Sequence, residues 1–264
     1  LREALASSDC LYGLTHTYAG YPMVKEARSR IAAGQLGTVR RVAVQYPQGW
    51  LATALEQDQN KQAAWRLNPA KAGVSSCMGD IGVHAANLAE FICGIEITHL
   101  CADLATFVEG RTLDDDGSVL LRFDNGAKGV LMASQISVGE ENAIRVRAYG
   151  DKGGFEWCQE EPNSLLLKWN DKPREIVRTA AFGSFSPLAQ AATRTPAGHP
   201  EGYLEAMANL YTDFAKAVRA NQKGKAEGVP GINAGLRGMV FIDAMLASTD
   251  SDTKWESVSQ EGTQ

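Results

Sequence analysis

The sequence predicts an α+β fold, in which one large, mostly antiparallel, open β-sheet is flanked by helices. Two observations predict it. From Thr38 the hydrophobic period changes from a helical one to a period of two, and many short apolar segments between residues 98 and 178 are separated by tight turns such as Asp124-Asn125-Gly126. Short strands joined by tight turns are typical of an antiparallel meander and not of alternating β-α-β units.

The N-terminal part of the chain contains four expected elements. Residues 1–7 continue a helical pattern, and residues 10–18 (CLYGLTHTY) form a short apolar strand that ends on polar and aromatic side chains. The helix over 21–37 has Pro22 at its start and glycines at its end, which are common helix boundaries. The segment 39–46 alternates between apolar and other residues, so that we expect a strand with one buried face.

An irregular polar segment over 47–76 precedes a helix over 79–93. The strands of the meander follow at 98–107, 117–123, 128–137, 143–149, 153–158, 164–169 and 174–178. Their alternating pattern predicts that one side of the sheet packs on helices and that the other, partly polar side is solvated or pairs with another subunit. After a long loop over 179–200, helices over 201–222 and 231–249 and a polar, frayed tail complete the chain.

The composition is that of an ordinary globular protein, with 44% hydrophobic residues and a net charge of −5. No basic block indicates a nucleic-acid surface, and no apolar run approaches the ~20 residues that span a membrane. No signal peptide is visible. The five cysteines are scattered and never form a Cys-x-x-Cys pair, so we expect buried thiols in a cytoplasmic protein, without disulfides or a zinc site.

Asp80 and His84 stand four residues apart at the start of the helix over 79–93. At 100° per residue they share a stripe with Asn87 and Phe91, beside an apolar stripe that anchors the helix. The positive end of the helix dipole favours a neutral imidazole while the nearby carboxylate raises its pKa, which suits a general base. From spacing alone, a helix-capping Asp80 and a hydrogen-bonded core His84 remain the favoured interpretation. A metal site is not expected, because the other histidines have no ligand spacing.

Three further segments carry candidate residues. Trp65 and Arg66 could line a polyol pocket by stacking and hydrogen bonding, or they could equally be a core residue and a surface residue. The segment THTY (15–18) lies at the carboxyl end of the expected strand, where α/β sheets place ligands. His199 comes just before a helix start, where capping is the alternative. No Gly-x-Gly-x-x-Gly follows a strand, so the chain has no dinucleotide fingerprint.

Six segments, taken in order, resemble the Gfo/Idh/MocA family of NAD(P)-dependent oxidoreductases. They are GLTHTYAGYPMVKEAR, AAGQLGTVRRVAVQYPQGWL, KQAAWRLNPAKAG, MGDIGVHAANLAEFICG, GHPEGYLEAMANLYTDF and GLRGMVFIDAMLAS. The most specific is the Asp-x-Gly-x-His segment, which resembles the active-site helix of the family. Asn87 stands where many members carry Asp.

The resemblance implies a Rossmann domain followed by an α+β domain of the dihydrodipicolinate-reductase-like C-terminal type. Residues 1–37 would then be a remnant of the dinucleotide-binding domain, made of its last helix and strand and a linker helix. Residues 38–264 would be the substrate-binding and oligomerisation domain. We expect the glycine-rich loop and the Glu-Lys-Pro motif of the family upstream of Leu1, so that NAD or NADP is bound mostly by that segment.

The resemblance also implies residue roles. His84 resembles the acid/base histidine, which takes a proton from the hydroxyl as hydride leaves for the nicotinamide, and Asp80 resembles the residue that orients the substrate or the histidine. The residues implied for substrate binding are Tyr18, Trp65, Arg66, Asn87 and His199. Those implied for contact with the cofactor are His16 and Tyr18.

The sequence therefore predicts the substrate-binding part of an NAD(P)-dependent dehydrogenase that acts on a sugar, a cyclitol or a related polyol, inactive as a fragment. We expect a homodimer or homotetramer formed through the less apolar face of the sheet. One alternative is a non-catalytic sugar-binding or scaffolding protein that lacks the Rossmann half. Another is a metal-dependent hydrolase or isomerase that uses Asp80 and His84.

Overall fold

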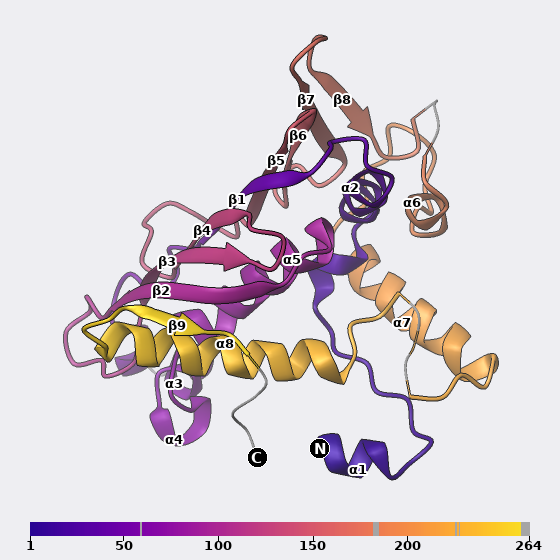
Figure 1. Ribbon diagram of the computed structural model, residues 1–264. Helices are drawn as coiled ribbons and strands as arrows, with labels where there is room; N and C mark the ends of the chain where they lie inside the picture. Colours follow the sequence, from indigo (N-terminus) through magenta and orange to yellow (C-terminus); the bar gives the residue numbers. More distant parts are fainter. Residues whose placement is uncertain (59, 182–184, 225, 227, 260–264) are drawn as a thin grey trace.

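A nine-stranded sheet forms the centre of the protein in a computed structural model that describes residues 1–58, 60–181, 185–224, 226 and 228–259. The strand order is β8-β7-β6-β5-β1-β4-β3-β2-β9 (Figure 1). The strands are β1 (Val39–Pro47), β2 (Ile97–Ala105), β3 (Asp116–Phe123), β4 (Lys128–Ser134), β5 (Arg145–Gly150), β6 (Gly153–Cys158), β7 (Ser164–Trp169), β8 (Glu175–Arg178) and β9 (Trp255–Ser257). The predicted large, mostly antiparallel sheet is thus confirmed.

One pair of strands departs from the antiparallel meander. β1 lies in the middle of the sheet, antiparallel to β5 and parallel to β4, with Pro47 opposite Ser134. The carboxyl ends of β1 and β4 therefore meet at the same edge of the sheet. The first residue of β5, Arg145, pairs with Gln45 near the end of β1, so the loop before β5 reaches this edge as well. Polar residues from three distant parts of the sequence are brought together there.

Helices cover one face of the sheet (Figure 1). They are α2 (Pro22–Ala32), which lies on β6 and β7, α5 (Val83–Cys93), which lies on β1, β4 and β5, and α8 (Ile232–Asp250), which lies on β2. The opposite face of the central strands is a broad, shallow groove in which Leu120 is 49% exposed. This face is the one for which we predicted solvation or pairing with another subunit.

The strand predicted over 10–18 is not formed, and this prediction was wrong. A strand needs a ladder of backbone hydrogen bonds to a neighbour, whereas here Tyr12 makes a single isolated bridge and Leu14 donates to the carbonyl of Pro230 at 2.8 Å. The helix over 1–7 is present as α1 (Arg2–Ala6), and the polar end of the segment becomes a short turn of helix, η1 (Thr17–Gly20). The predicted Rossmann remnant is therefore not confirmed as a helix followed by a strand.

Two segments predicted to be irregular contain short helices with asparagine or serine caps. The segment over 47–76 holds η2 (Leu55–Gln57), α3 (Lys61–Arg66) and α4 (Pro69–Ala72), and the loop over 179–200 holds α6 (Pro187–Ala191). Asn60 caps α3 by accepting from the amides of Gln62 and Ala63, and Ser186 caps α6. The tail that we expected to fray adds β9 to the edge of the sheet beside β2. Residues 59, 182–184 and 260–264 of these segments lie outside the described residues.

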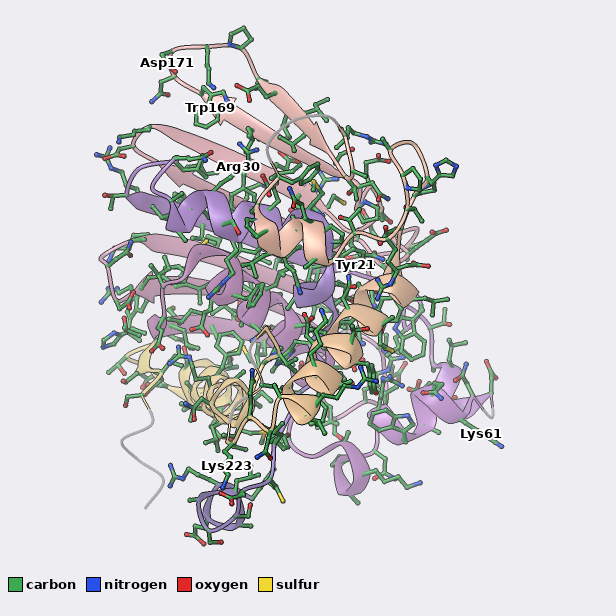
Figure 2. The ribbon with its side chains drawn as sticks, turned by 90° about the vertical axis from the view of Figure 1, so that its right-hand side faces the viewer. Tyr21, Arg30, Lys61, Trp169, Asp171 and Lys223 are labelled. Carbon is green, nitrogen blue, oxygen red and sulfur yellow. The ribbon has the colours of Figure 1, made fainter. Side chains whose placement is uncertain are left out.

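Helix α7 (Tyr203–Arg219) packs directly on the turn η1. The side-chain amide of Asn209, buried in this contact, donates to the carbonyl of Gly20 at 2.8 Å and to that of Ala192 at 2.9 Å. The backbones come so close that a Cβ atom at Gly20 would lie 2.0 Å from the carbonyl oxygen of Ala206. In Figure 2, Tyr21, the next residue, lies in the interior between α2 and α7.

The N-terminal segment shares the core of the sheet. Tyr18, Tyr21, Met23 and Val24 belong to the same hydrophobic cluster as the inward residues of the central strands. The division into 1–37 and 38–264 stays a prediction. Among the described residues, no helix is both long enough and apolar enough to cross a membrane.

Candidate active site

The helix that carries Asp80 and His84 begins with a π turn, η3 (Met78–Gly82), which continues into α5. Asp114, a buried carboxylate from the loop before β3, accepts from the amides of Ser76 at 2.9 Å and Met78 at 2.7 Å. The hydroxyl of Ser75 accepts from the amide of Gly79 at 2.9 Å. These groups cap the helix, so Asp80 is not its cap, and π turns of this kind are frequent at functional sites.

The carboxylate of Asp80 instead contacts polar side chains that come from outside this helix. One carboxylate oxygen accepts from Nε of Arg66 at 2.9 Å and from Nε2 of Gln135 at 3.0 Å. The guanidinium of Arg66 stacks over the ring of Trp65 at 4.4 Å, with Trp50 further away at 5.7 Å. Trp65 is 40% exposed, which leaves indole surface for a ligand. The result is an oriented carboxylate beside an aromatic surface.

His84 contacts two residues of the N-terminal segment. Its Nδ1 lies 3.1 Å from Nδ1 of His16, and its ring meets the edge of Tyr18 with centroids 5.5 Å apart. Within the described part of the chain, Nε2 of His84 has no hydrogen-bond partner. Burial lowers the pKa of His84, against the opposing effect of the Asp80 carboxylate, and burial together with His84 lowers the pKa of His16 to about 3. Both imidazoles are therefore neutral near pH 7, as a general base requires.

A chain of hydrogen bonds fixes the hydroxyl of Tyr18. The indole of Trp50 can only donate, and its Nε1 donates to Oε1 of Gln48 at 3.0 Å. The other end of the Gln48 amide is therefore Nε2, which donates to Oδ1 of Asn142 at 2.6 Å. Tyr46 also donates to Oδ1 of Asn142, at 2.7 Å, and the amide of Asn142 donates to the Tyr18 oxygen at 3.3 Å. The Tyr18 hydroxyl thus donates to that of Tyr46, and its remaining lone pair is available as an acceptor. Burial raises the pKa of both phenols.

The site contains four residues that were not predicted from the sequence, namely Tyr46, Gln48, Gln135 and Asn142. They lie at the end of β1, at the end of β4 and in the loop before β5, which the parallel pairing of β1 and β4 brings together. The sequence did contain a signal at β1. The residues YPQGW stand at the end of a strand and include polar and aromatic side chains, which is the pattern that made THTY a candidate. No local pattern indicated Gln135 or Asn142.

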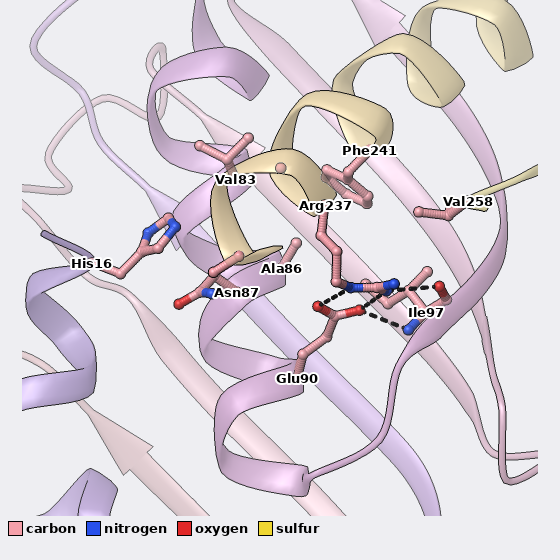
Figure 3. A pocket seen from close by; sticks show the side chains of 11 residues that line it. His16, Val83, Ala86, Asn87, Glu90, Ile97, Arg237, Phe241 and Val258 are labelled. Carbon is pink, nitrogen blue, oxygen red and sulfur yellow. Dashed lines mark hydrogen bonds and ion pairs between the residues drawn. The ribbon is translucent and has the colours of Figure 1, made fainter. Parts of the chain in front are cut away.

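The other predicted residues lie around this centre or away from it. Asn87 and His16 line a small cavity of about 20 Å³ together with Glu90 and Arg237 (Figure 3). His199 lies exposed on the loop before α7 and contacts none of the other predicted site residues. The structure thus brings together all the predicted residues except His199.

The residues present fit the reacting end of a nicotinamide-dependent oxidation and not the dinucleotide. A neutral imidazole with one unpartnered nitrogen lies beside an oriented carboxylate and a fixed phenol oxygen, whereas the sequence has no glycine-rich phosphate-binding turn after a strand. His16 and Tyr18 both lie against His84, and their contact with a cofactor stays a prediction. Among the described residues, no group of three or more His, Cys, Asp or Glu side chains is arranged to hold a metal ion.

Comparison with known proteins identifies the family of this chain. Residues 24–156 match the family model of the GFO/IDH/MocA C-terminal domain. The uncharacterized oxidoreductase YfiI of Bacillus subtilis is 31% identical over 253 residues, which are 93% of this chain and 64% of YfiI. The chain thus spans less than two thirds of that relative.

Three solved structures share the fold closely. An oxidoreductase from Sinorhizobium meliloti is 42% identical with a TM-score of 0.85, and the match covers 97% of this chain and 67% of that one. An inositol dehydrogenase homolog from Azotobacter vinelandii, complexed with NAD⁺, is 31% identical with a TM-score of 0.90 over the same shares. The same homolog complexed with NADH and myo-inositol matches at 29% identity and a TM-score of 0.85, over 97% of this chain and 66% of that one. The chain belongs to the Gfo/Idh/MocA family of oxidoreductases.

Proposed function

We propose that this chain supplies the substrate-binding half of an NAD(P)-dependent dehydrogenase that oxidises a hydroxyl group of a sugar, a cyclitol or a related polyol. The observation that carries the proposal is the neutral His84, whose Nδ1 contacts His16 while Nε2 has no partner in the described residues. Similarity to a homolog that is complexed with NADH and myo-inositol supports both the cofactor and the substrate class.

His84 is the general base of the proposed reaction. The nicotinamide, when bound, accepts the hydride from the carbinol carbon. Nε2 of His84 takes the proton of the same hydroxyl, so that an O–H bond breaks and an N–H bond forms. Because the histidine is neutral near pH 7, it needs no prior deprotonation.

Asp80 and Tyr18 position the substrate. The Asp80 carboxylate is held by Arg66 and Gln135 through one oxygen, which leaves its other oxygen to accept a hydrogen bond from a neighbouring hydroxyl. The free lone pair of Tyr18 accepts from another. A polyol presents several adjacent hydroxyl donors, which match these two acceptors.

Trp65 provides the apolar part of the pocket. Arg66 covers its indole at 4.4 Å, and the exposed remainder of the ring suits stacking against the C–H face of a sugar ring or a cyclitol. Because the guanidinium also donates to Asp80, Arg66 connects the stacking surface with the acceptor.

The proposal is tested by replacing His84 in the full-length gene product. His84→Gln keeps a polar side chain of similar size but removes the base, and we expect turnover to fall by about 10²-fold or more with a panel of polyols. His99→Gln is the matched control, because His99 is an exposed histidine on β2 whose side chain contacts Thr98 and none of the predicted site residues.

Two results would contradict this assignment. Near-normal turnover of His84→Gln would remove His84 from catalysis. Binding of a polyol by the wild-type protein without reduction of either NAD⁺ or NADP⁺ would favour the alternative of a non-catalytic sugar-binding protein.

We also propose a homodimer or homotetramer formed through the open face of the sheet. Leu120, Met132 and Val130 lie on this face between polar residues such as Arg147 and Asp103. A partly apolar sheet face with both charge signs is suited to pairing with a second copy of itself.

A further inference from the structure

We propose that His16 and His84 form a two-histidine proton relay, in which His16 receives the Nδ1 proton of His84 while Nε2 of His84 takes the proton of the substrate hydroxyl. The inference rests on the proposed function and adds a second residue to it. It gives His16, for which the resemblance implied a contact with the cofactor, a role in moving a proton away from the substrate.

The geometry of the two rings supports the relay. Their Nδ1 atoms are 3.1 Å apart, and the rings meet edge to face with an interplanar angle of 89°. A contact of this length between two neutral imidazoles is a hydrogen bond only if one Nδ1 carries a proton and the other does not. The pair therefore has two tautomeric states, one in which His84 donates and one in which His16 donates.

The two states correspond to a base and an acid. When His84 donates from Nδ1, its Nε2 is unprotonated and can accept the hydroxyl proton. When His16 donates, His84 carries its proton on Nε2 and can return it to a carbonyl in the reverse reaction. A flip between the two tautomers thus prepares His84 for each direction of the reaction.

Burial explains why a relay is needed. An imidazolium at His84 would lie in a largely buried place with few compensating groups. Facing it are the neutral His16, the protonated Tyr18 and the Asp80 carboxylate, which Arg66 already neutralises. If His84 loses its Nδ1 proton as Nε2 gains one, the pair stays neutral and this cost does not arise.

The cavity that His16 lines receives the last proton of the relay. The hydroxyl O–H bond breaks and Nε2–H of His84 forms; Nδ1–H of His84 breaks and Nδ1–H of His16 forms. Nε2–H of His16 then breaks, and this proton passes through a water molecule in the cavity to the solvent, which the partly exposed Asn87 and Glu90 reach. The hydride of the same oxidation leaves for the nicotinamide, so that electrons and protons are both accounted for.

The cavity has the size and lining that a water molecule needs. Its volume of about 20 Å³ exceeds the ~10–15 Å³ that one water requires. Figure 3 shows His16 and Asn87 at one side and the Glu90–Arg237 ion pair at the other. The amide of Asn87 and the carboxylate of Glu90, which also accepts from Arg237 and from the amide of Ile97, offer polar partners to that water.

The first test needs neither cofactor nor activity. In protein labelled with ¹⁵N at histidine, the nitrogen chemical shifts at pH 7.5 should show one protonated and one unprotonated Nδ1 in the pair, with both rings neutral. His16→Gln should change the shifts of His84 and leave those of His99 unchanged. Two rings that both carry their proton on Nε2 would overturn the relay, because no proton would then lie between the Nδ1 atoms.

The second test uses the full-length gene product. The amide of His16→Gln can still hydrogen-bond to Nδ1 of His84 but cannot pass a proton on, so kcat should fall by about 10²-fold while KM for the polyol stays within a few-fold. In His16→Ala, added imidazole should restore part of the lost rate. His99→Gln again serves as the control.

The outcomes separate the relay from the proposed function. Normal turnover of His16→Gln together with an inactive His84→Gln would overturn the relay and keep His84 as the base. Normal turnover of both variants would contradict the proposed function itself. If His16→Ala turns over slowly and added imidazole does not restore its rate, His16 has only a structural role and the relay is overturned.

Discussion

Acid should destabilise the folded chain through His16. Burial, followed by the neighbouring His84, lowers the pKa of His16 from 6.5 to about 3. Between these values the unfolded chain binds a proton at this residue and the folded chain does not. The stability that the neutral form contributes is therefore complete above pH 6.5 and is lost as the pH falls toward 3.

The magnitude at pH 5 follows from this interval. One pKa unit corresponds to about 1.4 kcal/mol, so at roughly 1.5 pH units below the ordinary pKa the loss is about 2 kcal/mol. His84 adds to the loss in the same direction, because burial lowers its pKa as well. His16→Gln has no titrating group at this position and should lose about 2 kcal/mol less than the wild type between pH 7.5 and pH 5.

The assay is urea unfolding of the wild-type protein and of His16→Gln at pH 7.5 and pH 5, followed by tryptophan fluorescence and circular dichroism. Carboxylates titrate in both proteins, so their effect cancels in the difference between the two pH dependences. Equal pH dependences for the two proteins would refute the reasoning, since His16 would then bind its proton equally well in the folded and unfolded chains.

Two further predictions concern the helix start and the sheet face. Asp114→Ala removes the acceptor for two backbone amides at the π turn, and the free energy of unfolding should fall by about 2–4 kcal/mol in urea titrations. Asp243→Ala, an exposed carboxylate on α8, should change it little, and equal effects of the two would contradict the capping role. Leu120→Asp should convert the proposed homo-oligomer into smaller species in sedimentation equilibrium, whereas Val74→Asp, also at an exposed apolar residue, should not. An unchanged mass of Leu120→Asp would place the interface elsewhere.

The sequence predicted the meander because its signals are local. Alternating hydrophobicity and turn residues such as Asn125-Gly126 fix strands and hairpins without reference to the rest of the chain. The pairing of β1 with β4 joins segments about 90 residues apart, and no local pattern indicates it. For the same reason the strand expected over 10–18 failed, because a strand also depends on a partner that local sequence does not show.

Residues of the candidate site were also hard to predict where their partners are distant in the sequence. The resemblance pointed to Asp80 and His84, and helical spacing gave the buried stripe beside them. The cap of their helix, however, comes from Asp114, a residue 34 positions after Asp80, so the capping role that spacing favoured for Asp80 was wrong. The partner of His84, at position 16, comes from the segment whose local structure we predicted incorrectly.

The close approach of α7 to the turn that carries Tyr18 has a consequence for how this protein can change in evolution. The closest approach at Gly20 is to the main-chain atoms of Ala206, which every residue type possesses. Substitutions along α7 that keep the helix intact and retain Asn209, whose side-chain amide donates to the carbonyl of Gly20, therefore preserve the position of the turn that carries Tyr18. The tolerance ends at residue 20 itself, where a single methyl group would push the helix and the turn apart. Selection on the geometry of the site therefore also acts on Gly20 and Asn209, which hold the turn against α7.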